Sequence, residues 1–136
     1  MHSWLIPAFI ALGLWTIWGV AVKLSTRYAD TSTLLLAQGV GNMVVTFAVA
    51  IWARFHIEGR PAGLALGFAA GIMGTLGTLF FYMALNRGRA SVVVPMTALY
   101  PILVAIIGVT VLREPFTWKV GLGAGLAMVA MLLFSI

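Results

Sequence analysis

Five long stretches without a charged residue divide this sequence, and they decide what the chain can fold into. Each contains 17 to 26 consecutive uncharged and mostly apolar residues. The hydrocarbon core of a bilayer is about 30 Å thick, so a helix crosses it with about 20 residues. The last stretch is the shortest, and Thr117 and Trp118 lengthen it at its start. The sequence therefore predicts five membrane-spanning helices, at residues 4–23, 31–54, 61–86, 90–112 and 117–136.

The composition agrees with a membrane protein and excludes a soluble enzyme. Apolar residues make up 62% of the chain and charged residues 8%, whereas about a quarter of the residues in a soluble domain are charged. The apolar stretches are continuous rather than alternating, which favours helices over the strands of a membrane β-barrel. The connections between them are too short to hold a soluble domain. We therefore expect one all-α membrane domain, a five-helix bundle over residues 1–136.

The basic residues lie singly or in pairs at the ends of the apolar stretches, where they anchor helices at the membrane surface rather than bind nucleic acid. The first and third connections carry Lys23, Arg27, Arg87 and Arg89, and the second and fourth carry Arg54, Arg60, Arg113 and Lys119. Cytoplasmic loops normally hold the excess of Lys and Arg, so this balance assigns no orientation. It fits a chain that inserts both ways and forms an antiparallel dimer, or a chance tie. A rule that gives most weight to the first helix places Lys23 and Arg27 on the cytoplasmic side and the N-terminus outside.

Polar and aromatic side chains within the predicted spans indicate a cavity. An amide or hydroxyl is costly in hydrocarbon without a partner, so such groups turn toward other helices or a water-filled space. In the second span, Gln38, Asn42 and Thr46 recur every four residues and share one helix face. Two explanations stay open, because such groups either face a solute or join helices together. The residues expected to line a solute cavity are Trp15, Trp18, Gln38, Asn42, Tyr82, Thr97 and Tyr100.

Prolines and charges add to the description of this cavity. Pro95 and Pro101 each remove a backbone donor from the fourth span and free carbonyl groups that could face a solute. No Asp or Glu lies within any of the five stretches, so the carboxylate that usually exchanges protons against a cation is absent. Lys23 is the charge placed to reach into a span. Turned inward, it would favour an anionic or zwitterionic solute.

The sequence offers no basis for catalysis. The chain has no cysteine, and its two histidines, His2 and His56, lie far apart. No nucleophile stands beside a base, and neither a metal-ligand spacing nor a glycine-rich phosphate loop is present. We expect no enzymatic activity, no catalytic residue, no metal and no cofactor.

Glycines at helical spacing predict close helix packing, because small residues let membrane helices approach one another. One face of the third span carries Gly63, Gly67, Gly71, Gly74 and Gly77. This face is expected to touch another helix, of the same chain or of a second copy. In the last span, Gly121 and Gly125 form a small-xxx-small pair and are the preferred dimer contact. Glu114 is expected to cap that helix, because a carboxylate complements the helix dipole there.

Several short motifs together resemble one family. They are the run from Ala84 to Pro95, Leu99-Tyr100-Pro101, Arg113-Glu114-Pro115, Gly121, Trp18-Gly19 and Lys23. In combination they resemble the EamA-type unit of the drug/metabolite transporter superfamily, over essentially the whole chain. The resemblance implies a carrier of small polar metabolites or drugs. Most members have ten helices in two inverted five-helix repeats with the cavity between them, so it also implies that a partner chain supplies a second repeat.

These observations combine into one predicted function. We expect a secondary transporter subunit in the cell inner membrane that moves a small polar metabolite or drug by alternating access as a homodimer. A heterodimer is an alternative. So is a scaffold or accessory subunit that transports nothing and pairs with another small membrane protein. The expected partners are a small-molecule substrate, the lipid bilayer and a second membrane chain, and no nucleic acid.

Overall fold

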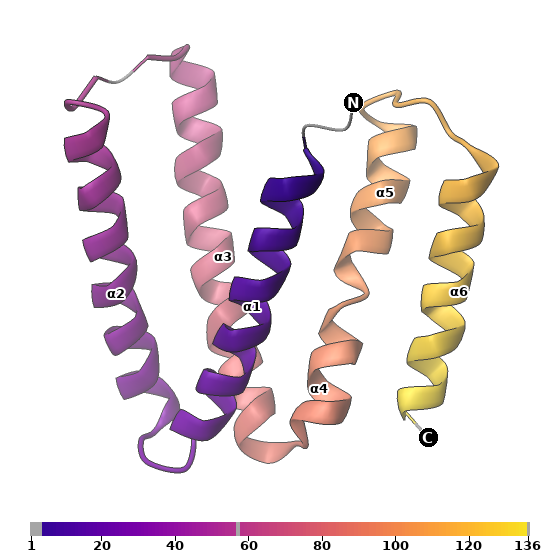
Figure 1. The fold of residues 1–136 in the computed structure, drawn as a ribbon, viewed down its shortest axis with the longest axis horizontal. Helices are drawn as coiled ribbons and strands as arrows, with labels where there is room; N and C mark the ends of the chain where they lie inside the picture. Colours follow the sequence, from indigo (N-terminus) through magenta and orange to yellow (C-terminus); the bar gives the residue numbers. More distant parts are fainter. Residues whose placement is uncertain (1–3, 57, 136) are drawn as a thin grey trace. The chain divides into compact units, whose positions relative to one another are not determined.

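The structure is a computed structural model, and it describes residues 4–56 and 58–135. Within these ranges the chain forms α-helices and no strands, in agreement with the predicted all-α membrane fold (Figure 1). It divides into an N-terminal unit, Met1–Arg87, and a C-terminal unit, Gly88–Ile136. Each unit contributes three of the helices and is described by itself.

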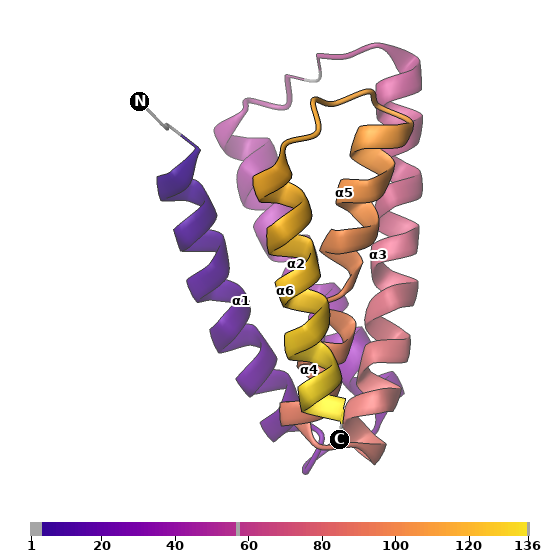
Figure 2. The same cartoon turned by 90° about the vertical axis from the view of Figure 1, so that its right-hand side faces the viewer.

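The N-terminal unit consists of α1 (Leu5–Ser25), α2 (Thr31–Trp52) and α3 (Pro61–Arg87). Both α1 and α2 pack against α3. The three helices converge where the turn between α1 and α2 lies beside the last turns of α3, and α1 leans away from α3 toward its other end (Figure 2). The buried side chains of the unit, Val22, Tyr82 and Leu85, gather at the convergent end.

Local signals set both ends of α2. At its start, the carboxylate of Asp30 accepts hydrogen bonds from the N–H groups of Ser32 and Thr33, at 3.0 and 3.3 Å. This is the usual cap of a helix N-terminus. At its end, Arg54 adopts a left-handed conformation with φ 53°, and the N–H of Phe55 bonds to the carbonyl five residues earlier at 2.8 Å. A left-handed residue with such a bond is a common way to end a helix.

The C-terminal unit consists of α4 (Ala90–Thr97), α5 (Tyr100–Thr110) and α6 (Trp118–Ser135), and α4 packs against α6. The sequence predicted one helix over 90–112, whereas the structure breaks it between Thr97 and Tyr100. Pro95 lies inside α4 and Pro101 lies in the first turn of α5. Neither proline has an N–H to donate, and the ring of each crowds the preceding turn, so the helix is interrupted where the two effects overlap.

The lengths of the helices agree with the predicted spans. Among the described residues, α1, α2, α3 and the broken stretch Ala90–Thr110 are long and apolar enough to cross a membrane. The apolar part of α6, Trp118–Ala130, is shorter. Apart from the break in the fourth span, the observed helix ends lie within two residues of the predicted ones.

Two glycines of the C-terminal unit make room for side chains from the connection between α5 and α6. A Cβ placed on Gly108 would lie 2.8 Å from the carboxylate of Glu114, and one placed on Gly121 would lie 2.8 Å from the ring of Phe116. The connection turns through Arg113, whose φ is 56°, and the N–H of Glu114 donates to the Gly108 carbonyl at 3.0 Å. The expectation that Glu114 caps the last helix is therefore wrong, because its side chain lies against α5 and α6 begins at Trp118.

Candidate solute site in the N-terminal unit

A partly buried hydrogen bond joins α2 to α3 within the membrane-spanning region. The hydroxyl of Tyr82 donates to the side-chain oxygen of Gln38, and the Tyr82 side chain is only 2% exposed. The Trp18 side chain of α1 lies close to the same hydroxyl. Trp18 also stacks on Phe81, with the ring centroids 5.5 Å apart and the planes inclined by 18°. The structure thus brings together three predicted site residues, which we call the Trp18–Gln38–Tyr82 cluster.

Two other predicted site residues of this unit lie outside the cluster. Trp15 is 64% exposed. Asn42 is exposed as well, and with Thr46 and Phe47 it lines a surface groove of about 630 Å³ on α2. No residue of this groove comes from α1 or α3. An exposed amide in the middle of a membrane-spanning helix needs a partner, so protein or water from outside this unit is expected to cover it.

The remaining two predicted site residues, Thr97 and Tyr100, belong to the C-terminal unit. They stand on either side of the break between α4 and α5. The Thr97 hydroxyl bonds to carbonyls of its own helix, those of Val93 and Val94, both at 3.0 Å. Tyr100 is 57% exposed. Whether these two residues line a solute cavity stays a prediction.

The two threonine hydroxyls of α3 are satisfied within their own helix. Thr75 donates to the carbonyl of Gly71, and Thr78 donates to the carbonyl of Gly74, both at 2.9 Å. Bonds of this kind to the preceding turn let a polar side chain sit in a membrane helix without a partner on another helix. These threonines therefore do not hold the unit together, unlike Tyr82.

Two further hydrogen bonds join the helices at the convergent end of the unit. The ammonium of Lys23 donates to the Leu85 carbonyl at 2.7 Å. This carbonyl is among the last four of α3, which have no partner within the helix, and a positive charge there also suits the helix dipole. The amide of Asn86 donates to the Thr31 hydroxyl at 2.6 Å. The sequence analysis identified Lys23 as able to turn inward but missed the second contact, for which the only signal was a polar residue at each of two adjacent helix ends.

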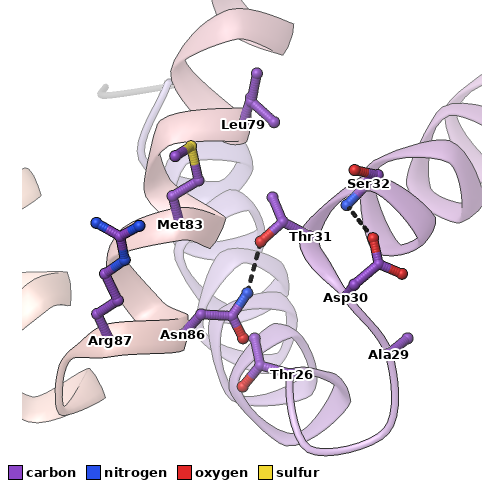
Figure 3. Close-up of a pocket in the computed structure, with 9 residues that line it drawn as sticks. All are labelled: Thr26, Ala29, Asp30, Thr31, Ser32, Leu79, Met83, Asn86 and Arg87. Atoms are coloured by element: carbon purple, nitrogen blue, oxygen red, sulfur yellow. Dashed lines mark hydrogen bonds between the residues drawn. The ribbon is translucent and has the colours of Figure 1, made fainter.

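A pocket of about 610 Å³ opens at this end (Figure 3). Its wall combines the turn between α1 and α2, the first turn of α2 and the last three turns of α3. Asp30 and Arg87 stand on opposite sides of it, with Met83, Thr31 and Asn86 between them (Figure 3). The lining residues are Thr26, Ala29, Asp30, Thr31, Ser32, Leu79, Met83, Asn86 and Arg87. Sequence reasoning did not predict this pocket, because it forms only where three helix ends meet.

The carboxylate of Asp30 is held in its ionised form. The Thr33 hydroxyl donates to it at 2.5 Å, and the backbone N–H groups of Thr33 and Ser32 donate as well. These hydrogen bonds, with that of the Thr33 hydroxyl contributing most, hold the pKa of Asp30 below its usual value. At neutral pH the pocket therefore carries one negative charge from Asp30 and one positive charge from Arg87.

Within the N-terminal unit, the glycine face of α3 has no close neighbour. A Cβ added at Gly63, Gly67, Gly71, Gly74 or Gly77 would meet nothing within 4 Å. In the C-terminal unit, Gly125 is open in the same way, whereas Gly121 is occupied by Phe116. Of the two glycines predicted as a dimer contact, Gly125 thus presents the bare surface.

The long apolar helices and the polar contacts between them define an integral membrane protein. Residues 2–136 match the family model of the EamA-like transporter family, and the chain belongs to this family, within the drug/metabolite transporter superfamily. It is also 29% identical over 73 residues to an uncharacterised protein of Methanocaldococcus jannaschii, a match that covers 54% of this chain and 53% of that protein. The chain thus spans about half the length of this curated relative. No solved structure matches it.

Proposed function

We propose that this chain is a subunit of a secondary transporter that carries a small polar metabolite or drug across the cytoplasmic membrane. The observation that carries the proposal is the Trp18–Gln38–Tyr82 cluster, where uncharged hydrogen-bonding groups from three helices meet within the membrane-spanning region. Discontinuous helices are a recurrent feature of transporter binding sites, and the break between α4 and α5 beside Thr97 and Tyr100 is one. Membership of a transporter family supports the same function.

The transporting unit in this proposal is a dimer that works by alternating access. Asn42 and the glycine face of α3 are uncovered within the N-terminal unit, and a second bundle would satisfy the amide and fill the glycine surface. Two bundles rocking about a cavity between them would expose it to each side in turn. The balanced basic residues favour an antiparallel pair. The preferred contact is the Gly121 and Gly125 face of α6, of which Gly125 is the open part.

Solute flux into liposomes that contain only this purified chain tests transport directly. Transport of a polar solute by the wild-type chain is expected to fall at least tenfold in Tyr82→Phe, which keeps the ring and removes the donor to Gln38. Trp52→Phe is the matched control, because Trp52 is an 86% exposed aromatic residue at the end of α2. If the wild type transports the solute and Tyr82→Phe transports it equally fast, the cluster is not part of the solute site.

Reporters fused to the C-terminus, each active on one side of the membrane, test the arrangement of the subunits. An antiparallel dimer with dual topology predicts signal from both reporters. A single orientation contradicts the antiparallel pair and leaves a parallel dimer or a heterodimer.

The second candidate function is a membrane scaffold or accessory subunit. The observation that favours it is the absence of Asp and Glu from the apolar stretches, which leaves no acid to couple solute movement to protons. It predicts no flux from the purified chain alone, together with a stable complex with another small membrane protein. Purification from native membranes with mild detergent, followed by identification of co-purified chains, separates it from the transporter.

A further inference from the structure

The pocket at the convergent end of the N-terminal unit extends from the membrane surface into the hydrocarbon. Asp30 lies in the turn between two spans, and Arg87 ends a third. Leu79 lies eight residues before Arg87 on α3, which at 1.5 Å per residue is about 12 Å deeper. The 27 residues of α3 span about 40 Å, more than the hydrocarbon core, so the Arg87 end reaches the depth of the lipid head groups.

The polar end of the pocket carries two opposite charges that do not neutralise each other. The guanidinium of Arg87 has no hydrogen bond or ion pair with any residue that the structure describes, and its side chain runs along α3 toward Met83 (Figure 3). The carboxylate of Asp30 stands on the other side, and its hydrogen bonds go to the first turn of α2. These bonds leave its negative charge in place, and they leave Oδ1 with room for a further donor.

The deeper end of the pocket is apolar. Leu79 and Met83 line it, and no charged residue lies among the lining residues below Asn86. A ligand that is complementary to the whole pocket therefore carries a cationic group, an anionic group and an apolar tail. A simple anion would meet Asp30, a simple cation would meet Arg87, and a small polar zwitterion would leave the apolar wall uncovered.

We propose that this pocket binds a zwitterionic amphiphile, with a primary ammonium beside Asp30, a phosphate on Arg87, and a tail along Met83 and Leu79. This is the chemistry of an ethanolamine phospholipid. An ammonium can donate to the free position on Asp30 and to the side-chain oxygen of Asn86, whereas the quaternary ammonium of a choline lipid has no N–H. A guanidinium is the side chain best suited to a phosphate. The site does not depend on transport, because occupancy is measured without flux.

Native mass spectrometry of the purified full chain in detergent, with short-chain lipids added, tests the proposal. Dihexanoyl phosphatidylethanolamine is expected to bind on the order of tenfold more tightly than the matching choline or glycerol lipid, because each of these loses one charge-assisted hydrogen bond. Free phosphoethanolamine, which has the same head group and no tail, is expected to bind more weakly still. Equal binding of all three lipids would overturn the proposal, and equal binding of free phosphoethanolamine would replace the lipid by a soluble zwitterion.

Three variants assign the binding to the pocket. Asp30→Asn keeps an oxygen that caps α2 and removes the charge, and it should weaken ethanolamine-lipid binding on the order of tenfold. Arg87→Gln should weaken it by a similar factor. Arg27→Gln removes an exposed positive charge at the same end that does not line the pocket, and it should leave binding unchanged. Unchanged binding in Asp30→Asn and Arg87→Gln, with thermal unfolding like that of the wild type, would show that the lipid binds elsewhere.

Discussion

The two units of this chain hold their helices together in different ways. In the N-terminal unit, three unbroken helices are tied at one end by side-chain hydrogen bonds, such as those from Lys23 to Leu85 and from Asn86 to Thr31. In the C-terminal unit, one span is broken, and the connection from α5 to α6 folds back so that its side chains fill spaces left by glycines. Polar groups join the first unit, and close packing of small residues shapes the second.

Glycine shows the difference most clearly. Gly108 and Gly121 are each occupied by a side chain of the same chain, those of Glu114 and Phe116. A Cβ added to any of the glycines of α3 would meet no atom of the N-terminal unit within 4 Å. The same residue type thus accommodates a side chain at Gly108 and Gly121 and leaves a bare surface on α3 and at Gly125. A glycine pattern in a membrane helix therefore does not by itself distinguish an internal contact from an external one.

The largest effect is expected where the N-terminal unit converges. Leu85 is fully buried, and Leu85→Ala should destabilise the protein by about 2 to 5 kcal/mol, since it removes buried contacts and leaves a cavity. Leu66→Ala, at a position 72% exposed on the same helix, is the control and should change stability little. Unfolding in mixed micelles with increasing denaturing detergent measures both. Equal losses in the two variants would mean that the helices do not converge at Leu85.

The next largest effect on stability is expected where a side chain already fills the space beside a glycine, as at Gly121, compared with a glycine that has empty space beside it, as at Gly67. Gly121→Leu forces the Phe116 ring to move, and because this ring is 63% exposed and can shift, the cost should be about 1 kcal/mol, at the low end for overpacking. A Cβ at Gly67 meets no atom within 4 Å, so Gly67→Leu should cost less. Thermal unfolding in detergent measures this difference, and matching losses at the two positions would contradict the contrast between the units.

The same glycines test the dimer contact. Gly125 is open, so Gly125→Leu should shift the protein toward monomer in cross-linking or sedimentation without the internal clash expected at Gly121. If Gly125→Leu stays dimeric and Gly67→Leu becomes monomeric, the contact lies on the glycine face of α3.

A smaller effect is expected for the hydrogen bond between α2 and α3. Side-chain hydrogen bonds between membrane helices contribute about 0.6 kcal/mol on average in double-mutant cycles. Tyr82→Phe, Gln38→Leu and the double variant should give a coupling energy of about this size, measured by the same unfolding assay. A coupling energy of zero would show that the two side chains act independently.

The smallest effect concerns the cap of α2. Because hydrogen bonds lower the pKa of Asp30 in the folded protein, its stabilising contribution is fully present above the unfolded pKa and is lost as the pH falls through the lowered folded pKa. Acidification from pH 6 to below pH 3 should therefore lower the protection of the amides in the first turn of α2, which is their hydrogen-exchange rate compared with the intrinsic rate at the same pH. Asp30→Asn keeps the cap without a titrating group, so its protection should depend less on pH. An equal pH dependence in both proteins would assign the effect to other groups.

The sequence by itself determined the membrane class, the all-α fold and the ends of the helices, with the exception of the break in the fourth span. Charged residues mark where a span must stop, and this rule acts locally along the chain. The sequence did not predict the break, because prolines such as Pro95 can either bend a helix or end it, and packing selects between these outcomes.

Only the tertiary structure decided which of the polar and small residues meet. Gln38 and Asn42 lie four residues apart on the same helix and both carry an amide. Yet Gln38 bonds to Tyr82, whereas Asn42 faces outward. The pocket between Asp30 and Arg87 likewise combines helix ends more than 50 residues apart in the chain. Periodicity fixes the face of a helix that a residue occupies, but the neighbour of that face depends on how the helices pack, which acts across the chain rather than along it.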